Sequence, residues 1–389
     1  MKYIVNAKLV LDAGIEWDGV IAVENGRIAA CGSRSELPIP ADAELLDAKG
    51  SYVGPGFVDL HVHGGNGHFF YAEPEAAAEH FLSHGETTIL PTLYYDMDKQ
   101  QLLDAIRRVR QVIGTGAGKA IGGLYMEGPY MNPKYGACAD RNRWKGDVCR
   151  EDYAPLVDEA GTLAKVWAVA PEREGLEPFL EYARAVNPDV VFSAGHSEAS
   201  PAQLRRLKRY GLCLQTHCMN ATGRVEQWLG TRACGPDEAC LLDDEMYAEM
   251  ICDSVGIHVN PELQRLILKT KGTDRVILIT DSYVSSEPSP ASLSHISDLV
   301  FDHNGNLNGS KLTLDVACRN LMHHTDCGIV QAFRMASRNP ARIIGMDSEL
   351  GSIAPGKRAN LVFVDDMFHV NAVMLEGEIW PQQAISPVG

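Results

Sequence analysis

Hydrophobic and polar positions divide the chain into two β-rich ends and a long mixed middle. Residues 1–50 read as short strands separated by turns, and the Asn25-Gly26 pair is a strong signal for a two-residue hairpin turn. A second β-rich stretch covers residues 351–365 and 372–380. Two such segments at opposite ends of a chain most simply form one small sheet domain that both termini build.

In the middle of the chain, apolar strand-like runs alternate with segments whose hydrophobic residues recur at helical spacing, ending at or near glycine. The helical segments include 73–85, 99–114, 201–211 and 261–272. The strand-like runs are 52–63, 87–94, 120–128, 164–172, 189–196, 212–218, 248–259 and 275–282. Eight strand-then-helix units fit a (β/α)8 barrel, which commonly takes about 250 residues plus insertions. We therefore predict an α/β protein with a barrel in residues 53–346 and a small β-sandwich domain in residues 1–52 plus 347–389.

Polar residues in the apolar runs gather at one end of the predicted strands. Because barrel strands are packed on both faces, a polar side chain there needs a partner or a task. The residues concerned are Asp59, His61, His63, Glu127, His196, His217 and Asp281. The carboxyl ends of barrel strands share one mouth, where barrel enzymes place their chemistry. We therefore expect these side chains to converge.

Histidines and a carboxylate at such a mouth, without a suitably placed pair of thiolates, indicate a divalent metal site of the zinc or iron type. A single buried histidine is more often a core residue, but histidines on several strands that share one end favour a site. Period-two spacing points His61 and His63 into the same mouth. Asp59 faces the same way and is interpreted either as an outer hydrogen-bond acceptor or as an additional oxygen ligand. Asp281 could relay a proton between water and a leaving group, or cap the next helix.

Composition narrows the range of partners. The formal net charge of −16 disfavours nucleic acid and anionic lipid, because affinity for both comes mainly from lysine and arginine. The start of the chain has no signal-peptide pattern, and no uncharged apolar run reaches about 18 residues, so we expect a cytoplasmic protein without a membrane span. The ten cysteines form no CxxC pair and are expected to be reduced thiols.

The order of the site motifs resembles the N-acetylglucosamine-6-phosphate deacetylase family of the amidohydrolase superfamily. The main resemblance lies in GFVDLHVHG at 56–64, MEGPY at 126–130, GHSEAS at 195–200, THCMNA at 216–221 and LITDS at 278–282. Segments 307–315, 339–345 and 351–362 are also similar, so the resemblance covers essentially the whole chain. A glutamate followed by Gly-Pro at the third strand, in place of a carboxylated lysine at the fourth, is typical of this deacetylase branch.

The resemblance implies a metal-dependent amide hydrolase of amino sugar metabolism, acting on the acetyl group of an N-acetylglucosamine or N-acetylgalactosamine 6-phosphate. Water activated by the metal would attack the amide carbonyl. By analogy, Glu127 would bind or bridge the metals, His196 and His217 would bind one ion, and His61 and His63 a second. Asp281 would be the general acid and base. The implied cofactor is one or two zinc or iron ions, with two favoured by both first-strand histidines, and the implied assembly is a homodimer.

The resemblance also assigns substrate contacts, and two of these are altered. The family places against the substrate a histidine matching His258, the backbone around Asn220 and Ala221, and a closing loop that contains Ser310. Cys138 stands where the family usually has a histidine that holds the acyl carbonyl. The phosphate-binding arginine is out of register, with Arg224 and Arg232 as candidates. The loop residues Arg141, Arg143 and Lys145 offer other anion contacts, or are simply solvated.

These departures leave three functions to weigh. Deacetylation of an amino sugar phosphate is the expected one, and the principal alternative is an amidohydrolase acting on another N-acyl amine or a cyclic amide. The loss of histidine at Cys138 favours that alternative. The third is a non-catalytic sensor of metal or sugar phosphate, against which Asp281 argues, since a binder needs no proton shuttle.

Overall fold

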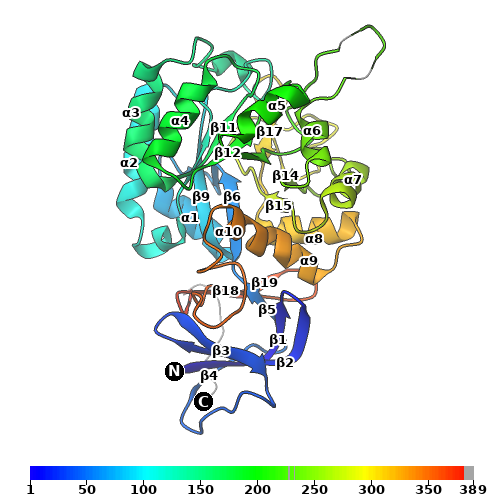
Figure 1. Cartoon of the computed structure of the whole chain (residues 1–389). Coiled ribbons are helices and arrows are strands. Elements are labelled where there is room, and N and C mark those ends of the chain that lie inside the picture. Colours follow the sequence, from blue (N-terminus) through cyan, green and yellow to red (C-terminus); the bar gives the residue numbers. More distant parts are fainter. Residues whose placement is uncertain (227, 232, 381–389) are drawn as a thin grey trace.

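The computed structural model describes residues 1–226, 228–231 and 233–380, which form a barrel and a smaller sheet at one end of it (Figure 1). The barrel sheet has the order β15-β14-β13-β12-β11-β10-β9-β6, with parallel neighbours throughout. Its strands are β6 (Phe57–Val62), β9 (Glu86–Tyr94), β10 (Leu124–Glu127), β11 (Ala164–Val169), β12 (Val191–Ala194), β13 (Leu212–Gln215), β14 (Tyr247–Ile251) and β15 (Val276–Ile279). A parallel bridge between Val62 and Ser282 brings the two edges of this sheet together. The predicted eight-stranded barrel is confirmed.

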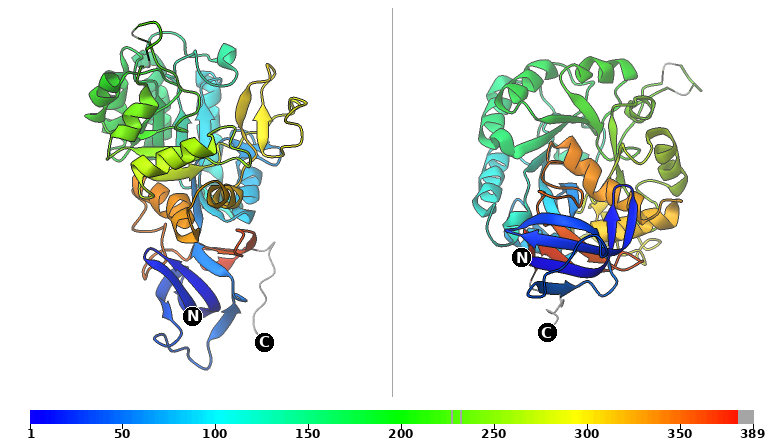
Figure 2. Two further views of the ribbon diagram at one scale, coloured as in Figure 1. Left: turned by 90° about the vertical axis from the view of Figure 1, so that its right-hand side faces the viewer. Right: turned by 60° about the horizontal axis from the view of Figure 1, so that its bottom comes forward.

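Helices form a ring around the barrel strands (Figure 2). They are α1 (Pro74–Ser83), α2 (Lys99–Val112), α3 (Arg150–Ala160), α4 (Leu176–Val186), α5 (Pro201–Lys208), α6 (Pro236–Leu242), α7 (Pro261–Lys271), α8 (Leu314–His324), α9 (Ile329–Phe333) and α10 (Asn339–Ile343). Local sequence fixes several starts: Asp98 caps α2 and Ser200 caps α5, each in a capping box with a glutamine three residues later. The helices bury their apolar faces against the strands and leave the strand ends to form the mouth.

The two ends of the chain build one mixed sheet with the order β20-β19-β18-β5-β1-β2-β3, to which β4 adds beside β1. Its strands are β1 (Lys2–Leu11), β2 (Gly14–Glu24), β3 (Arg27–Ser33), β4 (Glu44–Asp47), β5 (Tyr52–Pro55), β18 (Leu361–Val364), β19 (Val370–Leu375) and β20 (Glu378–Ile379). Asn25 and Gly26 turn between β2 and β3 with φ of 51° and 76°, as a type I′ hairpin requires. The expected small β domain from both termini is confirmed, while the boundaries at residues 52 and 347 stay a prediction.

Two short hairpins lie outside the main sheets. β7 (Gly64–Gly65) pairs with β8 (His68–Phe69) directly after the first barrel strand, and β16 (Leu299–Phe301) pairs with β17 (Leu307–Ser310) after the last one. The β16–β17 hairpin is tied to the barrel because Ser310 N–H donates to the Asp281 carbonyl at 2.9 Å. It therefore contributes to the rim of the barrel mouth.

Two expectations concern the whole chain. All ten cysteines are free thiols, as expected. Within the described ranges, none of the helices combines the length and the apolar character that crossing a membrane requires.

Gly54 of β5 lies where the small sheet meets the barrel. A Cβ atom at this position would lie 2.1 Å from Cε1 of Phe333, whose ring packs against Phe57 and Phe368 at centroid distances of 5.5 and 5.3 Å. Gly54→Ala should therefore displace a packed ring and lower the free energy of unfolding by about 1–3 kcal/mol. Urea unfolding followed by circular dichroism measures this loss. Gly146→Ala is the control, because nothing lies within 4 Å of that added atom, and an equal loss there would contradict the packing argument.

Candidate metal centre

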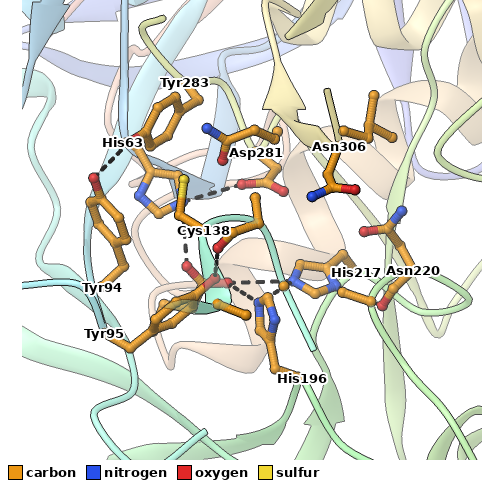
Figure 3. A pocket seen from close by; sticks show the side chains of 18 of the residues that line it. His63, Tyr94, Tyr95, Cys138, His196, His217, Asn220, Asp281, Tyr283 and Asn306 are labelled. Carbon is orange, nitrogen blue, oxygen red and sulfur yellow. Dashed lines mark hydrogen bonds and ion pairs between the residues drawn. The ribbon is translucent and has the colours of Figure 1, made fainter. Parts of the chain in front are cut away.

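The ends of four barrel strands bring together two overlapping groups of side chains that could hold metal ions. One group is His61, His63 and Glu127, and the other is Glu127, His196 and His217. Within each group the potential ligand atoms all lie within 4.8 Å of one another. None of these five residues, which we call the metal cluster, is more than 5% exposed. Figure 3 shows the side chains of His63, His196 and His217 turned toward a common centre.

Glu127, at the end of β10, belongs to both groups. Its Oε1 lies 2.7 Å from His196 Nε2 and 3.4 Å from His217 Nε2. The other oxygen, Oε2, lies 3.4 Å from His63 Nε2, and Oε1 is also 3.6 Å from His61 Nε2. Burial by itself would raise the pKa of this carboxyl, but the surrounding imidazoles hold the pKa well below its ordinary value. An ionised carboxylate between two sets of imidazoles is a suitable bridge between two cations.

The orientation of the histidines fits a metal site. His61 Nδ1 lies 3.3 Å from a carboxylate oxygen of Glu249, and His217 Nδ1 lies 3.1 Å from the Asn220 carbonyl. A ring that donates one N–H in this way presents its other nitrogen, Nε2, as a ligand. Among the described residues, His61 Nε2 has no hydrogen-bond partner although it is fully buried. Imidazole and carboxylate donors suit zinc and iron, so the metal cluster fits one or two such divalent ions.

Three of the residues predicted to bind metal or transfer protons have a left-handed backbone. His196, His217 and Asp281 have φ of 43°, 27° and 47°. Such a conformation costs a residue other than glycine about 1–3 kcal/mol and tends to occur at functional sites. Hydrogen bonds hold it in place: Asn132 N–H donates to the His196 carbonyl at 3.0 Å, and Asp281 N–H donates to the His61 carbonyl at 2.8 Å. The left-handed backbone therefore lowers the stability of the fold at these positions, but it directs the three side chains into the mouth.

Asp281 lies beside the metal cluster without belonging to either group of three. Its Oδ1 is 3.2 Å from His63 Nε2 (Figure 3). The same oxygen is 3.6 Å from His61 Nε2. Burial would raise the pKa of this carboxyl, but His61 and His63 outweigh burial and lower the pKa. The histidines therefore favour the ionised form of this carboxyl.

The Asp59 side chain points toward Thr280, the residue that directly follows β15. Its Oδ2 accepts a hydrogen bond from the Thr280 hydroxyl at 2.5 Å, and its Oδ1 accepts from the His61 N–H at 3.1 Å. Burial raises the pKa of Asp59 to about 7. Of the two interpretations of Asp59, these contacts favour the outer acceptor, which holds the backbone beneath His61.

A pocket of about 740 Å³ opens above the metal cluster. Among the predicted substrate contacts, Asn220, Ala221 and Cys138 line it (Figure 3). The remaining wall comes largely from tyrosines and from the tip of the β16–β17 hairpin: Tyr94, Tyr95, Tyr283, Asn304, Asn306 and Asn308. The pocket wall is thus rich in hydroxyl and amide groups.

Two predicted contacts lie one layer behind the pocket wall. His258 is buried, with Nδ1 3.0 Å from Asp253 and Nε2 3.0 Å from the Gly309 carbonyl. The Ser310 hydroxyl donates to the Thr280 carbonyl at 2.6 Å. Both residues therefore hold the backbone at Gly309, which does line the pocket.

The basic candidates are distributed differently. Arg224 is exposed, pairs with Glu238 at 2.8 Å and does not line the pocket. Arg232 lies outside the described residues. Arg141 and Arg143 line a second cleft of about 510 Å³, which shares Tyr94 with the main pocket.

That second cleft also contains Arg108 of α2. Lys145 does not line this cleft, and it donates to the Asp140 carbonyl at 3.2 Å.

In the main pocket, Cys138 N–H donates to Asp302 at 3.1 Å and Cys138 Sγ lies 3.9 Å from His303 Nδ1. These contacts fasten the loop after β10 to the β16–β17 hairpin.

Sequence analysis missed two buried carboxylates at this site. Glu249 lies within β14, and Asp253 follows that strand; both have no exposed surface. Asp253 accepts the backbone N–H groups of Ile257 and His258 and so shapes the turn that carries His258. The available signal was the same as for the other residues, a carboxylate in an apolar run, but Glu249 lies in the middle of strand β14 and not at its carboxyl end.

Comparisons with known proteins show which family and which solved structures this chain is similar to. A family model described as the amidohydrolase family matches residues 52–380. The chain is 30% identical to N-acetylgalactosamine-6-phosphate deacetylase of Escherichia coli O157:H7, over 97% of this chain and 99% of that protein. It is similar to the solved structure of N-acetylglucosamine-6-phosphate deacetylase from Pasteurella multocida, with 25% identity, a TM-score of 0.84 and coverage of 97% and 99%.

A second solved structure is a substituted form of the Mycobacterium smegmatis N-acetyl-D-glucosamine-6-phosphate deacetylase in complex with N-acetyl-D-glucosamine-6-phosphate. The chain matches it with 27% identity and a TM-score of 0.80, over 97% of this chain and 98% of that one. The matches extend over the small sheet as well as the barrel. Since the family model covers most of the sequence, this chain belongs to the amidohydrolase family.

Proposed function

We propose that this protein is a metal-dependent deacetylase of an N-acetylated hexosamine 6-phosphate. The observation that carries the proposal is the metal cluster, in which two ligand groups share Glu127 and Asp281 lies 3.2 Å from His63 Nε2. The similar proteins are named for N-acetylgalactosamine and N-acetylglucosamine 6-phosphates, which supports this substrate class and leaves both epimers as candidates. A homodimer and a cytoplasmic location stay predictions.

The metal cluster supplies the ligands for the proposed cofactor. Glu127, His196 and His217 would hold one divalent ion, and Glu127 with His61 and His63 would hold a second. When bound, such ions lower the pKa of water and polarise the carbonyl of the scissile amide. Zinc or iron would suit these donors.

Asp281 would move the proton that amide hydrolysis requires. Its Oδ1 would accept the proton of the attacking water and return it to the amide nitrogen as the C–N bond breaks. The amine then leaves as a neutral molecule, and the acetic acid released with the amino sugar phosphate loses its remaining proton to the solvent to become acetate. The position of Asp281 supports this role, because its Oδ1 lies 3.2 Å from His63 Nε2, beside the ligand groups.

The pocket wall would hold the sugar. Asn220, Ala221 and Cys138 would contact it directly, since they line the pocket. His258 and Ser310 would act through the hairpin backbone at Gly309, which both of them hold. This arrangement suits a hairpin that closes on the substrate.

The phosphate would bind to Arg141 and Arg143 in the second cleft, beyond Tyr94. A charge-assisted hydrogen bond is worth about 1.5–3 kcal/mol, or roughly a 10- to 100-fold change in affinity. Arg141→Ala should therefore raise KM for the phosphorylated sugar by about that factor and leave KM for the unphosphorylated sugar unchanged. Steady-state kinetics on both sugars measures the difference. Lys145→Ala is the control from the same loop, and an equal effect of Arg141→Ala on both sugars would reject the assignment.

Amide hydrolysis across a panel of compounds, followed as acetate release from the acetylated ones and by mass spectrometry for the others, tests the proposed activity. The panel contains the 6-phosphates of N-acetylglucosamine and N-acetylgalactosamine, N-acyl amino acids and a cyclic amide. We expect turnover of at least one sugar phosphate and its loss after treatment with a chelator. Turnover of the other compounds alone would favour a different amidohydrolase, an alternative that Cys138 in the pocket supports. Binding of a sugar phosphate without any turnover would favour a sensor.

A further inference from the structure

Glu249 is a fully buried carboxylate inside the barrel. It lies in the middle of β14, and no lysine or arginine of the described ranges forms an ion pair with it. A buried charge without hydrogen-bond partners costs several kcal/mol, so a carboxylate is retained in such a place only with strong local contacts. Its contacts therefore indicate its task.

The first contact is with His61. Glu249 Oε2 lies 3.3 Å from His61 Nδ1, while the ring of Tyr125 lies against the His61 ring at a centroid distance of 4.5 Å. With Nδ1–H directed to Glu249, the lone pair of His61 Nε2 points toward Glu127 and Asp281, each 3.6 Å away. Glu249 and Tyr125 thus set both the tautomer and the plane of this ring.

The second contact is with His217. The same oxygen, Glu249 Oε2, accepts the His217 backbone N–H at 3.1 Å. His217 has a left-handed backbone with φ of 27°, and its ring Nε2 lies 3.4 Å from Glu127. A hydrogen bond from its own N–H is a direct way to hold that strained conformation. One carboxylate oxygen therefore contacts a residue of each ligand group.

We propose that Glu249 is a positioning residue that holds both ligand groups of the metal cluster in their binding geometry, orienting the ring of His61 and fixing the backbone of His217. It is absent from the described residues that line the pocket, so it does not act on the substrate. The inference rests on the proposed metal-dependent function. It predicts that the affinity of the metal cluster for its ions depends on Glu249.

Metal binding to the full-length protein tests the role without a substrate. Metal-free wild type, Glu249→Gln and Glu249→Leu are titrated with Zn²⁺ against a chromophoric chelator, and the spectrum of bound Co²⁺ reports the ligand geometry. Loss of a residue that orients a metal ligand typically weakens metal affinity by about 10- to 100-fold. We expect such a loss at the weakest-bound ion for Glu249→Gln, a larger loss for Glu249→Leu, and altered Co²⁺ spectra for both.

Glu86→Gln is the matched control. Glu86 is another fully buried strand carboxylate, but its contact is with the backbone N–H of Leu314 at 2.8 Å. It should leave Zn²⁺ affinity and the Co²⁺ spectrum unchanged, and melting of the metal-free proteins checks that every variant is folded. Wild-type affinity in both Glu249 variants would overturn the positioning role alone. A wild type that binds no metal would instead reject the metal centre itself.

Discussion

Replacing Glu127 with alanine should empty both halves of the metal cluster and lower kcat/KM by about a thousandfold or more, since a catalytic metal contributes several kcal/mol. Glu127 is the one carboxylate common to both ligand groups. Without it, His196 Nε2 and His217 Nε2 face each other at 3.2 Å with no negative charge between them. The four imidazoles carry no charge that offsets the cost of burying two divalent ions, and the neighbouring Asp281 belongs to neither ligand group.

Elemental analysis after dialysis, alongside kinetics, measures this loss. Glu127→Gln separates charge from shape, because the amide keeps one oxygen in place but carries no charge, and it should lose at least one ion. Glu159→Ala removes a carboxylate that pairs with Arg107 and Arg110 away from the mouth and should keep the full metal content. A Glu127→Ala protein that retains the wild-type metal content would refute the bridging role.

The composition of the metal cluster could be predicted because it depends on topology. Glu127 and His196 are 69 residues apart in the chain, yet the side chains meet at 2.7 Å. No local pattern encodes that contact. It follows from eight parallel strands whose carboxyl ends share one mouth, and the strands themselves could be recognised from their apolar runs.

The surroundings of the cluster could not be predicted in the same way. Glu249 lies deeper in the barrel, in the middle of its strand, so a search for polar residues at strand ends does not find it. His258 lies behind Gly309 because Asp253 folds the intervening turn around its carboxylate, a contact that no periodicity encodes. The positions of Arg141 and Arg224 depend on loop conformation and not on register along a strand.

This division has a physical origin. Regular elements repeat a simple pattern, so hydrophobic periodicity fixes where their ends lie. Loops are shaped by individual hydrogen bonds, such as the one from Cys138 N–H to Asp302, between residues 164 positions apart. The reaction type is therefore tied to the barrel strands, whereas the substrate choice is tied to the loops.

Replacing Asp281 with asparagine should abolish most turnover while leaving the metal content intact. A general acid and base typically contributes about a 100- to 10,000-fold rate enhancement, so kcat should fall by that range with little change in KM. The neutral amide keeps the size of the side chain and its place beside His63 but cannot take up a proton. Asparagine also tolerates the φ of 47° at this position, whereas alanine would add backbone strain.

The Asp281→Asn experiment therefore separates proton transfer from metal binding. Because Asp281 belongs to neither ligand group, the elemental analysis should match the wild type, in contrast to Glu127→Ala. Glu86→Gln is the control for loss of a barrel carboxylate, since Glu86 accepts the Leu314 N–H and does not line the pocket. This variant should lower the free energy of unfolding, while its kcat should stay close to that of the wild type. Turnover by Asp281→Asn within about tenfold of the wild type would be too small a loss for a proton shuttle and would move that role to another group.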